Sequence, residues 1–394
     1  MEQAYIVEGF RTAVGRAHKG AFKSTRSDDL AVAVINHLIN AVPQIDPGRI
    51  DDLIVGCAYP EGEQGLQMGR LIGLMCLPTK VPGFIVNRFC GSGLESIAIA
   101  SQRIQAGMAD IIIAGGTESM TMIPRNGYKL SPNPEMAINH PEYLISMGLT
   151  AENVAEKYHI TRERQDEYSF LSHQKAIAAI NEGKFKNEIV PITIKERYPD
   201  HNEQIHIHEF VFSEDEGPRP DTSIEKLASL QPVFKQNGLI TAGNSSPMND
   251  GSSFVLVVSG KALKEFNLKP KLRVVSYAAI GVPPEIMGIG PVEAVPLALQ
   301  KAGLTLNDID LIELNEAFAS QALAVIDQLK LPIQKVNVNG GAIALGHPLG
   351  ATGAKLTTQL MNEMSRRNSR YGIVTACIGG GQGVAGIFEN LRTR

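Results

Sequence analysis

The sequence predicts a layered α/β fold built from two similar halves. Short apolar segments rich in Val and Ile alternate along the chain with longer segments whose apolar residues recur at helical spacing. Such alternation is typical of a fold in which helices cover the faces of a sheet. The same order of elements occurs twice, before residue 120 and after residue 270. This repetition indicates a duplicated unit with a pseudo-two-fold relation.

Four segments of the first half have the composition of buried strands: residues 3–12, 51–56, 81–86 and 110–116. Three helical segments lie between them, at residues 28–42, 65–77 and 94–104. Five segments of the second half follow the same order, at residues 272–281, 291–302, 308–315, 336–341 and 372–381. In such folds binding sites form at the carboxyl ends of strands, so we expect both halves to face one crevice.

Residues 120–245 differ in character from both halves. They contain a helical stretch at 150–182 and a polar run at 195–220, and we expect this insertion to pass over the active-site face. An apolar segment at 253–259 then returns to the first half as a strand. The predicted domains are residues 1–119 together with 246–269, the insertion 120–245, and residues 270–394.

The composition restricts the class of protein. Of 394 residues, 37 are basic and 41 are acidic, and the net charge of −4 argues against nucleic acid or an anionic membrane as the main partner. No apolar run approaches the roughly 18 residues of a membrane span, and the first residues lack the basic stretch of a signal peptide. The four cysteines form no CxxC pair, so neither a disulfide framework nor a zinc site is expected. A reducing cytoplasm suits them.

Cys90 lies between the predicted strand 81–86 and the predicted helix 94–104. Gly91 and Gly93 permit a tight strand-to-helix elbow there. A thiol at a helix N-terminus faces unpaired N–H groups, so we expect a lowered pKa and a nucleophilic sulfur. Free cysteine is also a common buried hydrophobic residue, and the elbow alone leaves these two interpretations equally open.

Three residues of the second half are candidates for the same chemistry. His347 lies in the glycine-rich stretch 339–354, where backbone can approach a ligand closely, and this context favours function over packing. Cys377 ends a predicted strand and precedes three glycines. It could move a proton beside amides that stabilise an oxyanion, or it could simply fill the core. Asn315 lies where a strand becomes a helix, and there a plain N-cap is the simpler interpretation.

Other polar motifs carry less weight. The histidines of the polar run, His201, His206 and His208, have no carboxylate or thiol at ligand spacing, so no metal site is predicted. The stretches 91–96 and 350–355 match neither a dinucleotide fingerprint nor a P-loop. Neither NAD nor ATP is therefore expected.

Six motifs together resemble the thiolase family along nearly the whole chain. They are residues 87–93, 115–120, 244–251, 315–318, 346–353 and 377–381. Their common order makes the resemblance specific. It implies a five-layer α/β/α/β/α fold of two duplicated halves with an inserted loop domain.

Within this family the chain is most similar to bacterial degradative 3-ketoacyl-CoA thiolases, because of Arg88, Phe89 and Leu349. The resemblance implies CoA-dependent cleavage of a 3-ketoacyl-CoA to acetyl-CoA and a shortened acyl-CoA, as in fatty acid β-oxidation. It implies no permanently bound cofactor, and coenzyme A serves as a co-substrate.

The resemblance also implies a role for each site residue. His347 takes the proton from Cys90, whose thiolate attacks the 3-keto carbon and becomes acylated. Cys377 protonates the departing acetyl-CoA carbanion and later deprotonates free CoA. The amides of Cys90 and Gly379 hold the tetrahedral oxyanion. His347 and a water on Asn315 hold the thioester oxygen of the enolate.

For CoA, the resemblance implies that Arg219 faces the nucleotide end. Phe234 and Ser246 would line the pantetheine channel, and Met147 would line the acyl or pantetheine pocket. Members of the family are usually homodimers or homotetramers. A hydratase/dehydrogenase subunit is a further candidate partner.

Three alternatives stay open. The nearest is the reverse chemistry, an acetyl-CoA C-acetyltransferase that forms acetoacetyl-CoA. A ketoacyl synthase shares the fold but is expected to pair its cysteine with two histidines, or with histidine and asparagine, and Cys377 argues against it. A non-catalytic thiolase-like lipid-binding protein would need a broken site, whereas all four catalytic side chains are present.

Overall fold

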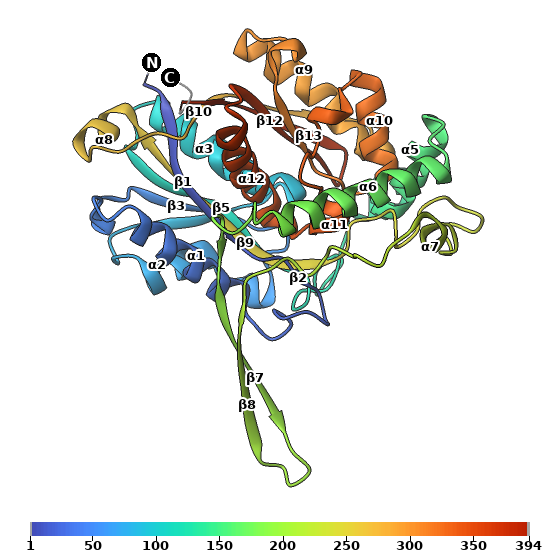
Figure 1. Ribbon diagram of the computed structural model, residues 1–394, viewed down its shortest axis with the longest axis horizontal. Helices are drawn as coiled ribbons and strands as arrows, with labels where there is room; N and C mark the ends of the chain where they lie inside the picture. Colours follow the sequence, from blue (N-terminus) through green and yellow to red (C-terminus); the bar gives the residue numbers. More distant parts are fainter. Residues whose placement is uncertain (1, 392–394) are drawn as a thin grey trace.

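The structure is a computed structural model that describes residues 2–391. Its largest element is a mixed sheet of eleven strands that runs through both halves of the chain (Figure 1). The strands along the sheet are, in spatial order, β11 (Leu311–Leu314), β12 (Tyr371–Ile378), β13 (Gln382–Asn390), β10 (Leu272–Gly281), β1 (Ala4–Thr12), β9 (Asn249–Ser259), β5 (Ile111–Ser119), β3 (Asp52–Gly56) and β4 (Gly83–Val86). Two short strands complete it: β2 (Gly15–Arg16) pairs with β9, and β6 (Ile189–Val190) pairs with β1.

The sheet has an internal symmetry about its centre. β1 and β10 meet there through two antiparallel pairs, Tyr5 with Arg273 and Ile6 with Leu272. Outward from this junction, one half has the order β1-β9-β5-β3 and the other has β10-β13-β12-β11. In each half the second strand is antiparallel to its neighbours and the outer pair is parallel. The predicted duplication is confirmed. The predicted segment 336–341 is an exception, since it contributes only an isolated bridge at Val336.

Helices divide the molecule into five layers. The outer layer of the first half contains α1 (Ser27–Ala41) and α2 (Met68–Cys76), whose apolar residues share one core with that half's strands. The outer layer of the second half contains α9 (Gly290–Ala302) and α10 (Ala319–Leu329), which share another core. Between the two half-sheets lie α3 (Ser92–Gln105) and α12 (Thr352–Arg367), and their common core includes strands of both halves. Burial on nearly all sides is what a central helix requires.

The two central helices begin next to one another. A Cβ added to Gly93, in the first turn of α3, would lie 2.8 Å from the carbonyl oxygen of Gly350, just before α12. Only glycine permits this approach of two backbones. Cys90 and His347 lie on the loops just before α3 and α12, so this contact brings those two loops side by side.

The insertion contains α4 (Pro134–Asn139), α5 (Met147–Lys157), α6 (Arg162–Asn181), β7 (Ile192–Pro199), β8 (Ile205–Phe212) and α7 (Ile224–Ala228). The predicted helical stretch at 150–182 consists of two helices, α5 and α6. His159 has a φ of 56°, and the Thr161 side chain accepts a hydrogen bond from Arg164 N, so a new helix begins there. The remaining helices are α8 (Gly260–Glu265) and α11 (Ala342–Leu345).

Strands β7 and β8 form a hairpin that projects from the body of the molecule (Figure 1). The expectation that the whole polar run covers the active-site face was therefore wrong for residues 195–212. Alternating apolar and polar residues let this stretch pair with itself as an antiparallel ribbon. His206 and His208 lie on this arm, where both are exposed and face the carboxylates of Asp200 and Glu196 at 2.9 and 4.0 Å.

Candidate active site

Cys90 lies in a tight turn, η3 (Phe89–Gly91), that joins β4 to α3. Phe89 has a φ of 41°, in the left-handed region that a non-glycine residue rarely adopts. Its N–H donates to Asn87 Oδ1 at 2.9 Å, and its carbonyl accepts from Ser92 Oγ at 2.7 Å. These bonds hold the strained turn, which presents the thiol at the N-terminus of α3.

The sulfur of Cys90 is not a thiolate in the resting protein. Burial raises the pKa of the Cys90 thiol to about 11. The N–H groups of Gly379 and of Cys90 itself hydrogen-bond to the sulfur and lower this pKa, whereas the charge of Glu118 raises it further. The expected lowering of the pKa was therefore wrong, because loss of water around the sulfur outweighs the helix N-terminus. Cys90 needs a base to become a nucleophile.

His347 is buried, and its hydrogen bonds fix which ring nitrogen carries the proton. Nδ1 lies 2.6 Å from Thr352 Oγ1, and that hydroxyl donates its only proton to the carbonyl oxygen of Pro348 at 2.9 Å. Nδ1 must then be the donor, which leaves the lone pair on Nε2. Burial and the charge of Lys355 lower the pKa of His347 to about 3, so the ring is neutral and Nε2 can accept a proton.

Asn315 faces the unprotonated Nε2 of His347. Its Nδ2 lies 3.3 Å from His347 Nε2, and its backbone N–H donates to Thr375 O in β12. The N-cap of α10 is Phe318, so Asn315 is not a helix cap. Its Oδ1 atom is buried and has no partner in the part of the chain that the structure describes. A buried acceptor of this kind fits a water molecule held at the site.

Cys377 lies near the end of β12 and is completely buried. Burial raises the pKa of its thiol, and the neighbouring Cys90 raises it further. The two thiols therefore interact, although they belong to different halves. Gly380 and Gly381 follow with φ values of 81°, and this turn places the Gly379 N–H against the sulfur of Cys90.

Two of the residues predicted to bind CoA lie beside these thiols. Met147 and Phe234 pack against the apolar cluster that contains Cys377. The Phe234 ring meets that of Phe318 edge-on, with centroids 6.2 Å apart. Ser246 lies on the next loop, where its N–H donates to Ala317 O at 2.9 Å. Met147 and Phe234 come from the insertion, Phe318 from the Asn315 motif, and Ser246 from the start of the segment that returns to the first half.

Arg219 lies apart from this group. It is exposed, and its backbone N–H donates to Nδ1 of the buried His173 at 3.2 Å. No contact joins it to the thiols. The structure thus brings eight of the nine predicted site residues together or onto adjacent loops, and leaves Arg219 separate.

Two polar residues of the site were not predicted. Thr352 lies in the same glycine-rich stretch as His347 and hydrogen-bonds to its ring. The closeness in sequence of this hydroxyl to a candidate base is the feature from which its role could have been predicted. Glu118 lies at the end of β5 and is fully buried, with hydrogen bonds to both halves. The sequence alone does not show whether a carboxylate at the end of an apolar strand is buried.

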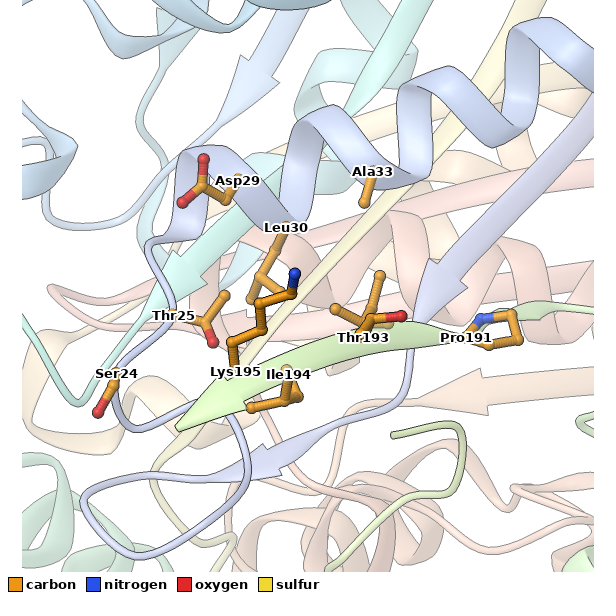
Figure 2. Close-up of a pocket in the computed structure, with 10 residues that line it drawn as sticks. Ser24, Thr25, Asp29, Leu30, Ala33, Pro191, Thr193, Ile194 and Lys195 are labelled. Carbon is orange, nitrogen blue, oxygen red and sulfur yellow. The ribbon is translucent and has the colours of Figure 1, made fainter. Parts of the chain in front are cut away.

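A groove elsewhere on the molecule is unrelated to this site. It lies between α1 and β7, at the base of the hairpin, and has a volume of about 440 Å³ (Figure 2). Asp29 and Lys195 line its two sides, and none of the predicted site residues lines it. Among the residues described, no three His, Cys, Asp or Glu side chains are grouped to hold a metal ion, and no helix has the length and apolar composition to cross a membrane.

The duplicated α/β fold places a cysteine on a strand-to-helix elbow that faces the second half, an arrangement suited to an enzyme with a thiol nucleophile. Residues 4–261 match the N-terminal domain of thiolase, and residues 268–390 match its C-terminal domain. The chain therefore belongs to the thiolase family, as its motifs predict.

Known proteins of similar sequence and structure agree with this assignment. The 3-ketoacyl-CoA thiolase of Bacillus subtilis (strain 168) is 52% identical over 392 residues, which cover 99% of this chain and 100% of the relative. The crystal structure of the Bacillus anthracis acetyl-CoA acetyltransferase matches with a TM-score of 0.89 at 40% identity, covering 99% of both chains. The crystal structure of human mitochondrial 3-ketoacyl-CoA thiolase matches with the same TM-score at 39% identity and covers 99% of both chains.

Proposed function

We propose that the protein cleaves 3-ketoacyl-CoA with CoA, and releases acetyl-CoA and a shortened acyl-CoA through an acyl-Cys90 thioester. The observation that carries this proposal is that two protonated thiols, Cys90 and Cys377, interact across the two halves, in a fold that also supplies a neutral His347 with its lone pair on Nε2. The full-length similarity to the Bacillus subtilis 3-ketoacyl-CoA thiolase supports the choice of substrate.

The first half-reaction begins with proton transfer from Cys90 to His347. The pKa values of about 11 and about 3 are too far apart for a resting thiolate–imidazolium pair. Proton transfer therefore accompanies attack of the sulfur on the 3-keto carbon. The new oxyanion forms next to the sulfur, within reach of the N–H groups of Cys90 and Gly379, which hydrogen-bond to that sulfur before the substrate binds.

Collapse of that adduct breaks the carbon–carbon bond and leaves the acyl group on Cys90. The electron pair stays on acetyl-CoA as an enolate, whose thioester oxygen is held by His347 and by a water on Asn315. The unpartnered Asn315 Oδ1 supports the water. Cys377 protonates the enolate carbon and is reprotonated by the thiol of free CoA. The CoA thiolate then attacks acyl-Cys90, and the departing Cys90 thiolate takes back the proton held by His347, which restores both thiols and the neutral imidazole.

CoA would reach this site through the insertion. Met147 and Phe234 offer an apolar wall beside Cys377, and Ser246 lies on the adjoining loop, which fits the pantetheine arm. The exposed Arg219 would meet the nucleotide end at a distance from the thiols. In this proposal residues 120–245 form the CoA-binding domain between the half formed by 1–119 with 246–269 and the half formed by 270–394.

The protein would act as a homodimer in the cytoplasm. Among the described residues β4 is an edge strand of the sheet, and nearby α2 exposes Leu71, Leu74 and Met75. An apolar surface beside an edge strand fits a second copy related by a two-fold axis. Light scattering of the purified protein should give the mass of a dimer, or of a homotetramer built from dimers. A monomer would contradict this part. A hydratase/dehydrogenase subunit would appear as added mass in a mixture.

Turnover across a series of 3-ketoacyl-CoA chain lengths tests the proposed activity. Each substrate is incubated with CoA, and acetyl-CoA and the shortened product are quantified by chromatography. Cleavage of substrates longer than acetoacetyl-CoA is the expected result. Cleavage of acetoacetyl-CoA alone would instead indicate an acetyl-CoA C-acetyltransferase. No cleavage of any length would contradict catalysis and favour a lipid-binding role.

A further inference from the structure

The side chain of Glu118 is completely buried at the end of β5, next to both halves of the site. Its Oε2 accepts hydrogen bonds from Ala58 N at 2.7 Å and from Gly350 N at 2.8 Å. Its Oε1 accepts from Gln64 Nε2 at 2.8 Å and from Tyr59 N at 3.3 Å. Four N–H donors on two oxygens use the acceptor capacity of an ionised carboxylate.

One branch of these bonds leads to the nucleophile. Glu118 holds the N–H of Ala58, and the carbonyl of Ala58 accepts from Asn87 Nδ2 at 3.0 Å. Asn87 Oδ1 in turn accepts from the N–H of Phe89, the residue in the left-handed conformation before Cys90. Ala58 and Asn87 thus connect the carboxylate, through hydrogen bonds, to the strained turn that presents the sulfur.

The other branch leads to the base. Gly350 belongs to the loop 346–352 that carries His347, and its N–H donates to Glu118 across the boundary between the halves. A Cβ at residue 350 would lie 2.7 Å from Glu118 Oε2, so glycine is needed for this contact. The same carboxylate therefore holds a loop of each half.

We propose that Glu118 is a positioning residue for the reaction proposed above: it fixes the Cys90 turn and the His347 loop relative to one another through one shared carboxylate. Positioning of a base and a nucleophile within a fraction of an ångström decides whether proton transfer and attack can occur together. The role rests on the proposed thiolase activity but can be measured without substrate.

The charge of Glu118 provides that independent measurement. Every group that hydrogen-bonds to the carboxylate is neutral, and the titratable groups that face it are Cys57, Tyr59 and Cys90. Burial raises the pKa of Glu118 itself, and its four N–H donors oppose that rise. In its ionised form the carboxylate raises the pKa of all three groups. Removing the charge should therefore make the Cys90 thiolate easier to form, which a purely structural contact would not do.

The test compares Glu118→Gln with the wild type in two assays. One assay measures the rate of Cys90 alkylation by iodoacetamide against pH in the absence of substrate, with the modified peptide identified by mass spectrometry. The other measures kcat and KM for 3-ketoacyl-CoA cleavage. We expect the alkylation midpoint to move to lower pH, and kcat to fall about 10- to 100-fold with a smaller change in KM.

Two further variants keep the test decisive. Asn87→Ala cuts the branch to Phe89 but keeps the charge, so kcat should fall while the alkylation midpoint stays at the wild-type pH. Asp52→Asn removes another buried carboxylate, at the opposite end of β3 beside Arg103, and should change neither the midpoint nor kcat.

The proposal would be overturned if Glu118→Gln had the same kcat and the same alkylation midpoint as the wild type. If Glu118→Gln does not fold, the proposal would be overturned by a kcat of Asn87→Ala equal to that of the wild type. An inactive wild-type protein would refute the thiolase activity, whereas a shifted midpoint in Glu118→Gln would still establish the link between Glu118 and Cys90.

Discussion

The imidazole of His347 donates its Nδ1 proton to Thr352 Oγ1 at 2.6 Å, and Thr352 donates its own proton to Pro348 O at 2.9 Å. This chain of two bonds fixes the tautomer in which Nε2 is the free base. The Nε2 atom then faces Asn315 at 3.3 Å. A buried neutral histidine with one fixed lone pair is suited to take a proton from a thiol.

Replacement of Thr352 by Val should therefore impair the base without removing it. The methyl group keeps the volume of the side chain, but it cannot accept the Nδ1 proton. We expect kcat to fall about 10- to 100-fold with little change in KM, measured by steady-state cleavage of a 3-ketoacyl-CoA. Thr352→Ser retains the hydroxyl and should keep most of the activity. Equal losses in both variants would contradict the tautomer assignment.

The alkylation profile of Cys90 should report a protonated thiol. With a pKa of about 11, the rate of modification by iodoacetamide should keep rising with pH through the neutral range and beyond. Cys57 and Cys377 are fully buried, and peptide mapping distinguishes them from Cys90. A plateau near neutral pH would mean that the resting sulfur is a thiolate. The proton-transfer step would then need revision.

Cys377→Ala should lose turnover while keeping a reactive Cys90. The variant has no group to protonate the acetyl-CoA enolate or to deprotonate CoA, so kcat should fall by about 100-fold or more. Cys90 should still react with iodoacetamide, because the turn that holds it is unchanged. Thermal unfolding checks that the buried substitution leaves the fold intact. Activity near the wild-type value would assign Cys377 to the core alone.

His347 should also make the stability of the protein depend on pH. Its pKa is lowered from 6.5 to about 3 on folding, so the unfolded chain binds a proton that the folded chain does not. The contribution of neutral His347 to the free energy of unfolding is complete above about pH 6.5 and is lost as the pH falls toward 3. Lowering the pH from about 7 to about 5 should reduce the free energy of unfolding of the wild type by about 2 kcal/mol through this histidine.

Urea unfolding of the wild type and of His347→Gln at the two pH values checks this expectation. The difference between the proteins isolates His347 from the other buried groups, such as His173, whose pKa is also lowered, to about 4. The acid-induced loss should be smaller in the variant. An equal loss in both proteins would mean that His347 titrates normally in the folded state.

Most strands of the two halves could be predicted because they contain continuous apolar runs, such as residues 111–114 of β5. The hairpin strands β7 and β8 were not predicted, because they lie in or next to the polar run. β13 was missed, since its glycine-rich start hides a strand that pairs with both β10 and β12. Local motifs located Cys90 and His347. The acidity of Cys90 could not be predicted, because it depends on burial by the second half. Glu118 and Thr352 were missed because their roles arise from contacts across loops and not from spacing.

Trapping the covalent intermediate tests the central claim most directly. The protein is incubated with a 3-ketoacyl-CoA longer than acetoacetyl-CoA, without free CoA, and its intact mass is measured. We predict a mass gain of one shortened acyl group, mapped to the Cys90 peptide, absent in Cys90→Ala and released by CoA as acyl-CoA. An acyl group on another residue, or turnover retained in Cys90→Ala, would contradict the account.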